Sequence, residues 1–205
     1  MRAHIAVLNM GWVRVELAQR LMEVVITQRA YPLSLEFSGI GVERRPIASN
    51  RNRIVRDTPE DAEVLVMIDA DCIPPLNFLD AVDPELDIVG LPMPIWRSGG
   101  IYTGIVPLDG AETQPVGAME LVECKAVAAG VMFIARRVFT HPEMQFVDEF
   151  DGDGVLTSTE DHVYCDKARA LGFRVWANLG YPLAHVKEID LQKVWVMMAE
   201  ARGGV

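Results

Sequence analysis

The chain has 205 residues, half of them apolar, and a formal net charge of −10 at pH 7. This length suits one folded domain, which we predict for residues 1–205. The acidic charge argues against bulk binding to nucleic acid or to an anionic membrane surface, because both need a basic footprint. No apolar run approaches the roughly 20 residues of a membrane-spanning helix, so the sequence predicts no transmembrane segment.

The N-terminus and the cysteines favour a cytoplasmic protein. The first residues lead into a strand-like run without the long apolar stretch and cleavage site of a signal peptide. The three cysteines, at positions 72, 124 and 165, are widely separated and form no CxxC pair. Such spacing disfavours a disulfide framework or a zinc knuckle and favours a reducing compartment.

The first forty residues predict a strand, a helix and a second strand. Residues 5–8 and 33–37 have strand patterns, and residues 13–28 carry a helical stripe. The stripe contains Leu17, Leu21 and Val24, continued by Val25 or Gln28. Further strands are expected at 64–68, 87–91, 121–134 (interrupted at 128–130) and 173–177, and further helices at 47–56, 136–139, 159–171 and 189–201. This alternation predicts an α/β fold with a mainly parallel, Rossmann-like central sheet flanked by helices.

Two carboxylates directly follow the apolar strand expected at 64–68. Five apolar residues in a row are typical of a strand that is buried on both faces. Asp69 and Asp71 are two residues apart, so in an extended backbone they point the same way, beyond the carboxyl end of the strand where α/β sheets bind ligands. Two such oxygen donors suit Mg²⁺ or Mn²⁺ held between carboxylates and substrate phosphates. The alternative is that Asp71 caps a short helix beginning near Leu76.

Residues 44–56 are rich in arginine. They include five arginines and no lysine, and the planar fork of arginine suits phosphate better than lysine does. A helix from residue 47 onward would place Ala48, Arg51 or Asn52, and Val55 on one side. Arg51 and Asn52 are therefore candidates to reach a diphosphate or a base, and a solvated helix face is the equally weighted alternative.

Glycine and proline mark the middle of the chain. Residues 92–100, which include Trp96, have loop composition, and residues 101–117 are expected to form a hairpin edge or a mobile flap. Gly130 interrupts a strand-like run. Such a glycine marks the close approach of a ligand or of backbone, or else a plain bulge.

The acidic segment before the helix expected at 159–171 has the spacing of a calcium loop in part. It follows EF-hand spacing, except at the first position, through Glu149, Asp151, Asp153, Gly154 and Glu160. Pro142 and the lack of a helical stripe before the segment count against an EF-hand, as does the lack of a second such loop in the sequence. A non-catalytic calcium- or sugar-binding module that uses residues 149–160 is the alternative function.

Two adjacent acids, Glu160 and Asp161, open the helix expected at 159–171. A capping box from Thr157 to Glu160 would explain one of them. Because the two cannot share a helix face, the other can look into a cleft. A carboxylate there, near an acceptor hydroxyl, would act as a general base.

His185 follows the strand expected at 173–177. A lone histidine is more often structural than a ligand, but a neutral imidazole here would complete the coordination of an ion held by Asp71. We therefore expect Asp71, Asp161 and His185, which are far apart in the sequence, to converge around one cation.

Taken in order, these motifs resemble those of nucleotide-diphospho-sugar glycosyltransferases of the GT-A fold, close to the family 2 type. The resemblance covers most of the chain, from residue 5 to residue 185, and depends on the order of the motifs. The motifs are Arg51-Asn52, Asp69-Ala70-Asp71, Ala129-Gly130-Val131 with Arg136-Arg137, Glu160-Asp161, Gly172 with the strand after it, and His185.

This resemblance implies a metal-dependent, hexosyltransferase-like enzyme with a nucleoside-diphosphate sugar as donor and an unidentified acceptor. Asp69 would contact the sugar or ribose of the donor. Asp71, with His185, would hold Mn²⁺ or Mg²⁺ at the diphosphate. Asp161, with Glu160 beside it, would be the base that deprotonates the acceptor hydroxyl.

The resemblance also bears on the pockets and on related activities. Gly130 and the loop around Trp96 would shape the sugar and acceptor pockets. The family 2 motif Gln-x-x-Arg-Trp is absent, which disfavours a processive synthase. A nucleotidyltransferase would need a glycine- and lysine-rich phosphate loop after the first strand, and residues 9–20 have Gly11 as their only glycine and no lysine. The apolar side of the helix expected at 189–201 would face inward or join a partner chain in an oligomer.

Overall fold

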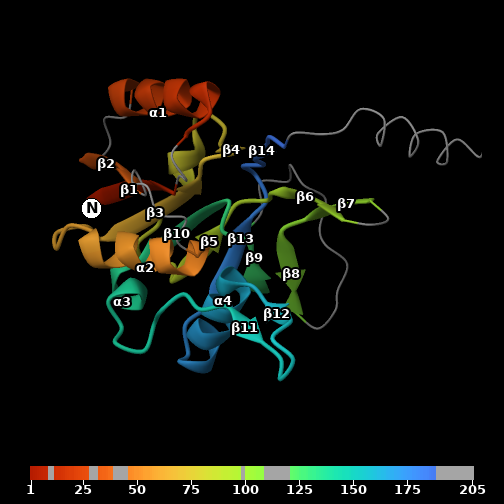
Figure 1. Ribbon diagram of the computed structural model, residues 1–205. Helices are drawn as coiled ribbons and strands as arrows, with labels where there is room; N and C mark the ends of the chain where they lie inside the picture. Colours follow the sequence, from red (N-terminus) through yellow and green to blue (C-terminus); the bar gives the residue numbers. More distant parts are fainter. Residues whose placement is uncertain (9–11, 28–31, 39–45, 98–99, 109–120, 188–205) are drawn as a thin grey trace, which may run out of the picture.

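The computed structural model describes residues 1–8, 12–27, 32–38, 46–97, 100–108 and 121–187 (Figure 1). Several predicted features lie outside these ranges: the helix at 189–201 with its oligomer contact, Gln28, Arg44, Arg45 and the later part of segment 101–117. Within the described ranges, no helix has the length and apolar character needed to cross a membrane.

An eight-stranded sheet forms the centre of the molecule (Figure 1). Its strands, in spatial order, are β2 (Leu33–Ser38), β1 (Ala3–Leu8), β3 (Val64–Asp69), β10 (Val131–Ala135), β5 (Ile88–Gly90), β13 (Val175–Asn178), β9 (Leu121–Val127) and β8 (Ile105–Pro107). β1 is parallel to β2 and β3, and β13 is parallel to β5. β10 is antiparallel to both of its neighbours, and β9 is antiparallel to β13 and β8. The α/β class is confirmed, but the sheet is mixed rather than mainly parallel, because the order of strands and helices along the chain does not fix the direction in which each strand joins the sheet.

Helices cover both faces of this sheet (Figure 1). α1 (Val15–Thr27) packs on one face through Leu17, Leu21 and Val24, together with the 3-10 helix η1 (Phe78–Ala81). α2 (Ile47–Asp57), α3 (Arg136–Phe139) and α4 (Glu160–Ala170) pack on the other face. Val25 is exposed and does not extend the α1 stripe. The apolar run of β3 is explained by burial between these two layers.

Three two-stranded sheets add to the core. β6 (Pro94–Arg97) pairs with β7 (Gly100–Thr103), so the loop expected at 92–100 is wrong for residues 94–97 and for Gly100. Proline is tolerated there because Pro94 is the first residue of its strand. β11 (Glu149–Phe150) pairs with β12 (Leu156–Ser158). β4 (Cys72–Ile73) pairs with β14 (Ala184–His185), which brings two distant segments of the chain together beside the end of β3.

Candidate active site

Asp69 and Asp71 lie where β3 leaves the sheet at its carboxyl end. The backbone N–H of Asp69 donates to the carbonyl of Gly130 (3.0 Å), which fixes this end of the strand against its neighbour. The predicted alternative that Asp71 caps a helix is wrong, because Asn77 occupies the N-cap position of η1. The two carboxylates have different partners.

His185 lies beside Asp71 because β14 pairs with β4. Its Nε2 atom is 3.5 Å from Asp71 Oδ2, and its Nδ1 atom is 2.7 Å from the carbonyl oxygen of Pro94. A carbonyl only accepts hydrogen bonds, so in the neutral ring Nδ1 carries the proton and Nε2 directs its lone pair toward Asp71. Histidines that bind metal ions are oriented by the same kind of outer contact.

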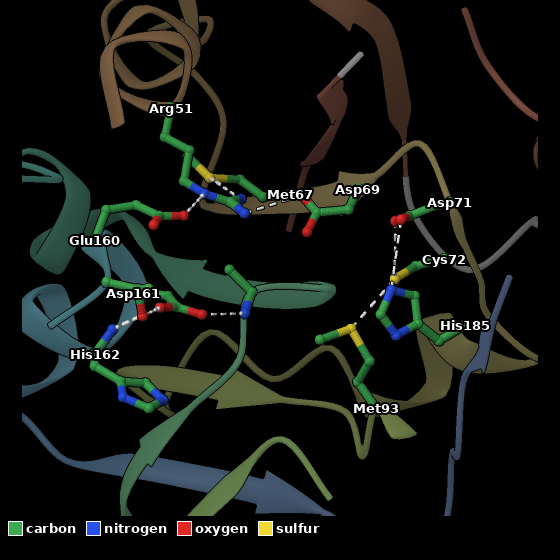
Figure 2. Close-up of polar contacts among 12 residues, drawn as sticks. Arg51, Met67, Asp69, Asp71, Cys72, Met93, Glu160, Asp161, His162 and His185 are labelled. Carbon is green, nitrogen blue, oxygen red and sulfur yellow. Dashed lines mark hydrogen bonds and ion pairs between the residues drawn. The ribbon is translucent and has the colours of Figure 1, made fainter. Parts of the chain in front are cut away.

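Cys72 joins Asp71 and His185 in a group of three potential metal ligands (Figure 2). One donor atom from each residue lies within 4.8 Å of the other two. In the part of the chain that the structure describes, no other three acidic, histidine or cysteine side chains meet this spacing. Burial, together with the charges of Asp69 and Asp71, raises the pKa of the Cys72 thiol.

A lysine also contacts Asp71. Lys187 Nζ forms an ion pair with Asp71 Oδ2. Burial opposes ionisation of this carboxyl, but the hydrogen bond and the charge of Lys187 outweigh burial and lower the pKa of Asp71. Asp71 is therefore charged at neutral pH, in surroundings that favour a cation.

Asp69 turns toward a buried arginine (Figure 2). Arg51 on α2 is 2% exposed; its Nη2 donates to Asp69 Oδ1 (2.9 Å) and its Nε donates to Glu160 Oε1 (3.0 Å). Burial raises the pKa of Asp69 to about 6, against the opposing effect of Arg51 and with a further rise from the charge of Asp71. We call Arg51, Asp69 and Glu160 the buried ion-pair cluster. The sequence contained one indication of this cluster, because the helical spacing could place Arg51 on the same side of its helix as Ala48.

Three residues predicted to bind ligand or act as a base serve the fold instead. Arg51 does not fit a role at a diphosphate, because its guanidinium is buried and paired with two carboxylates. Asn52 does not reach a base, because its Nδ2 donates to the carbonyl of Phe146 (2.7 Å) and its Oδ1 accepts from the N–H of Phe146 (2.8 Å). Glu160 is 7% exposed and paired with Arg51, so it does not fit a general base.

Asp161 is held at the N-terminus of α4 by three donors. Its Oδ2 accepts from the backbone N–H of Ala129 (3.2 Å), and its Oδ1 accepts from the Thr159 hydroxyl (2.6 Å) and from the N–H of His162 (2.9 Å). The capping box expected from Thr157 does not form, because Thr159 occupies the N-cap position. A carboxylate accepts about four hydrogen bonds, so Asp161 keeps one further acceptor position.

Asp161 and the Asp71–His185 pair lie at opposite ends of the site (Figure 2). Asp69 lies between them in this view. Asp161 is not a member of the ligand group around Asp71. The expected convergence of Asp71, Asp161 and His185 on one cation is therefore wrong, and the site is elongated along the edge of the sheet.

A hollow of about 380 Å³ lies next to the Asp161 end of the site. It is lined by Ile95, Tyr102, Thr103, Gly104, Ile105, Val106 and His162. Ile95 and Tyr102 are opposite each other in the β6–β7 hairpin, so this hairpin forms one wall. We expected the loop around Trp96 to shape a pocket. Ile95 of that segment lines the hollow, whereas Trp96 itself alternates to the other side of the hairpin and is exposed.

Gly130 lies at a tightly packed position rather than at a ligand. A Cβ atom at this position would lie 2.3 Å from Met93 Sδ and 2.9 Å from Cys72 Sγ. The close approach of two sulfur-containing side chains therefore explains the glycine at this position.

The acidic segment forms the tip of the β11–β12 hairpin and not a calcium loop. Asp151 Oδ1 accepts from the backbone N–H groups of Asp153 (3.0 Å) and Val155 (2.9 Å), which closes the turn. Gly154 adopts a φ of 78° at this tip, and Glu160 faces Arg51. Residues 149–160 all belong to the described ranges, and they do not gather into a group of potential ligands.

Glycosyltransferases are among the solved structures that share this fold. The catalytic domain of Drosophila beta1,4galactosyltransferase 7 has a TM-score of 0.56 and 15% identity, with 91% of this chain and 71% of that chain covered. GalNAc-T7 has a TM-score of 0.53 and 13% identity, with 92% of this chain and 44% of that chain covered. A197 from STIV has a TM-score of 0.58 and 17% identity, with 92% of this chain and 87% of that chain covered. No protein-family model and no curated protein matches the chain.

These similarities define the class of fold. The chain has a GT-A fold, as the motifs in the sequence predicted, and its central sheet, flanked by helices, is mixed. At such identities the similarity extends to the fold alone, so the function depends on the chemistry of the site.

Proposed function

We propose that this protein is a metal-dependent glycosyltransferase that moves a sugar from a nucleoside-diphosphate donor to an acceptor hydroxyl. The observation that carries the proposal is the meeting of Asp71 and His185 at the carboxyl edge of the sheet in a GT-A fold. Ligands of α/β sheets bind at this edge. Among proteins of the same fold, a mutant of the Drosophila galactosyltransferase forms a complex with manganese, UDP-Gal and xylobiose, and GalNAc-T7 is seen with UDP, GalNAc and Mn²⁺.

The donor chemistry of Asp71 and His185 fits a divalent ion. One offers a charged carboxylate, and the other offers an imidazole lone pair whose direction is set by the Pro94 carbonyl. These two residues would hold Mn²⁺ or Mg²⁺, and the ion would supply Lewis-acid stabilisation of the charge that develops on the departing nucleoside diphosphate. Lys187 would leave Asp71 when the ion binds and would remain as a cation beside the same phosphates.

Asp69 would bind the donor at the centre of the site. Arg51 engages its Oδ1 atom, so Oδ2 is the oxygen that would accept a hydrogen bond from a hydroxyl of the sugar or ribose. Because Arg51 also bonds Glu160, it would hold Asp69 in one orientation while the donor binds.

Asp161 would act as the base at the acceptor end. Its fourth acceptor position would take the proton of the acceptor hydroxyl. The hollow lined by Tyr102 and His162 lies next to this end and would receive the acceptor.

Nucleotide binding that depends on Mn²⁺ tests the proposal. We would measure thermal stability with UDP, GDP, CDP and ADP, each with and without Mn²⁺, because a ligand of the native state raises its apparent stability. We expect one nucleoside diphosphate to stabilise the chain only when Mn²⁺ is present. Asp71→Asn should abolish this shift and any hydrolysis of the donor sugar, whereas Asp166→Asn, a half-exposed carboxylate on α4, should keep both. A shift that persists in Asp71→Asn, or no Mn²⁺-dependent shift in the wild type, would contradict the proposal.

A further inference from the structure

We propose that Cys72 is a third protein ligand of the metal site, so that the site selects a thiophilic divalent ion such as Zn²⁺ or Co²⁺ over Mg²⁺. The inference rests on the metal role proposed above for Asp71 and His185, and it adds the identity of the ion. Carboxylate, imidazole and thiolate together are a ligand set that Zn²⁺ accepts. Mg²⁺ instead takes oxygen ligands in near-ideal octahedral geometry.

Two of the donor separations match a tetrahedral ion. Bonds of about 2.0–2.3 Å to oxygen, nitrogen and sulfur place two ligand atoms roughly 3.3–3.8 Å apart at the tetrahedral angle. Asp71 Oδ1 is 3.7 Å from Cys72 Sγ, and His185 Nε2 is 3.5 Å from Asp71 Oδ2. Octahedral Mg²⁺, with bonds of about 2.0–2.1 Å, would need adjacent donors roughly 2.9 Å apart. Both separations, each to a different oxygen of Asp71, fall in the tetrahedral range and exceed the octahedral one, and one donor atom from each of the three residues lies within 4.8 Å of the other two.

Backbone pairing holds these donors in place. Cys72 and His185 are directly opposite each other in the β4–β14 ladder, a position in which side chains share one face. The carbonyl of Asp71 accepts from the N–H of Val186 (2.9 Å), which continues the pairing past the strand. The hydrogen bond from His185 Nδ1 to the Pro94 carbonyl fixes the orientation of the His185 imidazole ring. The three ligands are therefore positioned by the fold and not by flexible loops.

The packing behind Cys72 also favours a sulfur-binding ion. Cys72 is fully buried, and its Sγ lies 3.4 Å from Met93 Sδ. Both sulfur atoms occupy the space that a side chain at Gly130 would fill. The polarisable thioether and the thiol thus form one wall of the site, which a thiophilic ion tolerates better than a hard one.

When the ion binds, the site releases one proton. The S–H bond of Cys72 breaks, a metal–sulfur bond forms, and the proton passes to the buffer with no transfer of electrons. Lys187 leaves Asp71 Oδ2, where the ion takes its place.

Cobalt spectroscopy of the full chain, without thiol reductants, tests the inference. We expect added Co²⁺ to give a thiolate-to-cobalt charge-transfer band that saturates at one ion per chain, that excess Zn²⁺ removes and that excess Mg²⁺ leaves intact. Cys72→Ser should abolish the band. It should also weaken Co²⁺ binding by at least about tenfold, since losing even an outer partner of a metal ligand costs about 10–100-fold. Cys72→Ala, which buries no hydroxyl, should do the same, and Cys124→Ser, at another buried free thiol, should keep both signals.

The outcomes separate this inference from the proposed function. Co²⁺ bound without the band, a band that survives in Cys72→Ser, or no Co²⁺ binding by the wild type would overturn the inference. The Mn²⁺-dependent nucleotide shift, measured on the same Cys72→Ser protein, reports on the enzyme separately. If that shift persists while the wild type lacks the band, the glycosyltransferase proposal stands and Cys72 is not a ligand. If Asp71→Asn leaves the shift unchanged, the glycosyltransferase proposal itself fails.

Discussion

Replacement of Arg51 by methionine would test the buried ion-pair cluster, which ties the end of β3 to the start of α4. Arg51 is 2% exposed and bonds Asp69 at 2.9 Å and Glu160 at 3.0 Å. Methionine keeps much of the side-chain volume but removes the charge, so two carboxylates lose their partner in a poorly solvated place. Breaking a buried pair by removing one member costs about 3–5 kcal/mol. We expect a loss of that order in the free energy of unfolding of Arg51→Met.

Urea unfolding of the full chain measures this loss. Arg53→Met is the matched control, because Arg53 is on the same helix, is about half exposed, and pairs with Asp57 four residues on. An exposed pair at this spacing contributes about 0.3–0.5 kcal/mol. A variant that combines Arg51→Met with Asp69→Asn and Glu160→Gln should recover part of the loss, because it leaves no unpaired charge.

The loss should also depend on pH, with a definite sign. The folded pKa of Asp69, about 6, lies above its value of about 3.9 in an unfolded chain. Asp69 therefore contributes stability below about pH 4, and this contribution is lost as the pH rises through about 6. Arg51 lowers the pKa of Asp69, so without Arg51 the pKa rises further, and Arg51→Met should lose more stability at pH 8 than at pH 5. A loss no larger than that of Arg53→Met, or equal at both pH values, would refute the reasoning.

Three further substitutions separate residues of the fold from residues of the site. Asn52→Ala should lower the free energy of unfolding by about 1–3 kcal/mol, because both backbone groups of Phe146 lose their partner; weaker Mn²⁺-dependent nucleotide binding by the folded variant would instead point to a ligand role. Gly130→Ala should cost about 1–3 kcal/mol in urea unfolding, since the added methyl would lie 2.3 Å from a sulfur atom, and an unchanged midpoint would contradict the packing argument. Lys187→Ala should tighten Mn²⁺ binding about 2–5-fold in calorimetry, because the ion no longer has to displace an exposed ion pair with Asp71 that contributes up to about 1 kcal/mol. An unchanged affinity would show that Lys187 does not compete with the ion.

The contacts of Arg51 and His185 show how far sequence reasoning reached in the site. The helical spacing placed Arg51 or Asn52 on the side of the helix that carries Ala48, and of these two residues Arg51 is the buried one. The pattern did not name a partner: a phosphate contact and a solvated helix face were weighted equally, and the buried ion pair was not foreseen. For His185 the chemistry of imidazole suggested a partner in Asp71, and the two do lie 3.5 Å apart. The expectation that Asp161 would join Asp71 and His185 around one cation was wrong. A position at the start of a helix does not say which end of the sheet the helix faces.

The sequence alone determined the elements whose signals are local. The apolar run of β3 followed by Asp69 and Asp71, the stripe of α1 and the start of α4 all follow from neighbouring residues, since burial on one face or two imposes a short repeat. The tertiary structure alone decided the direction of β10, the pairing of β4 with β14, and the pairing of Arg51 with Asp69 and Glu160. These features join residues far apart in the chain, and a short repeat says which side of an element is buried but not which partner covers it.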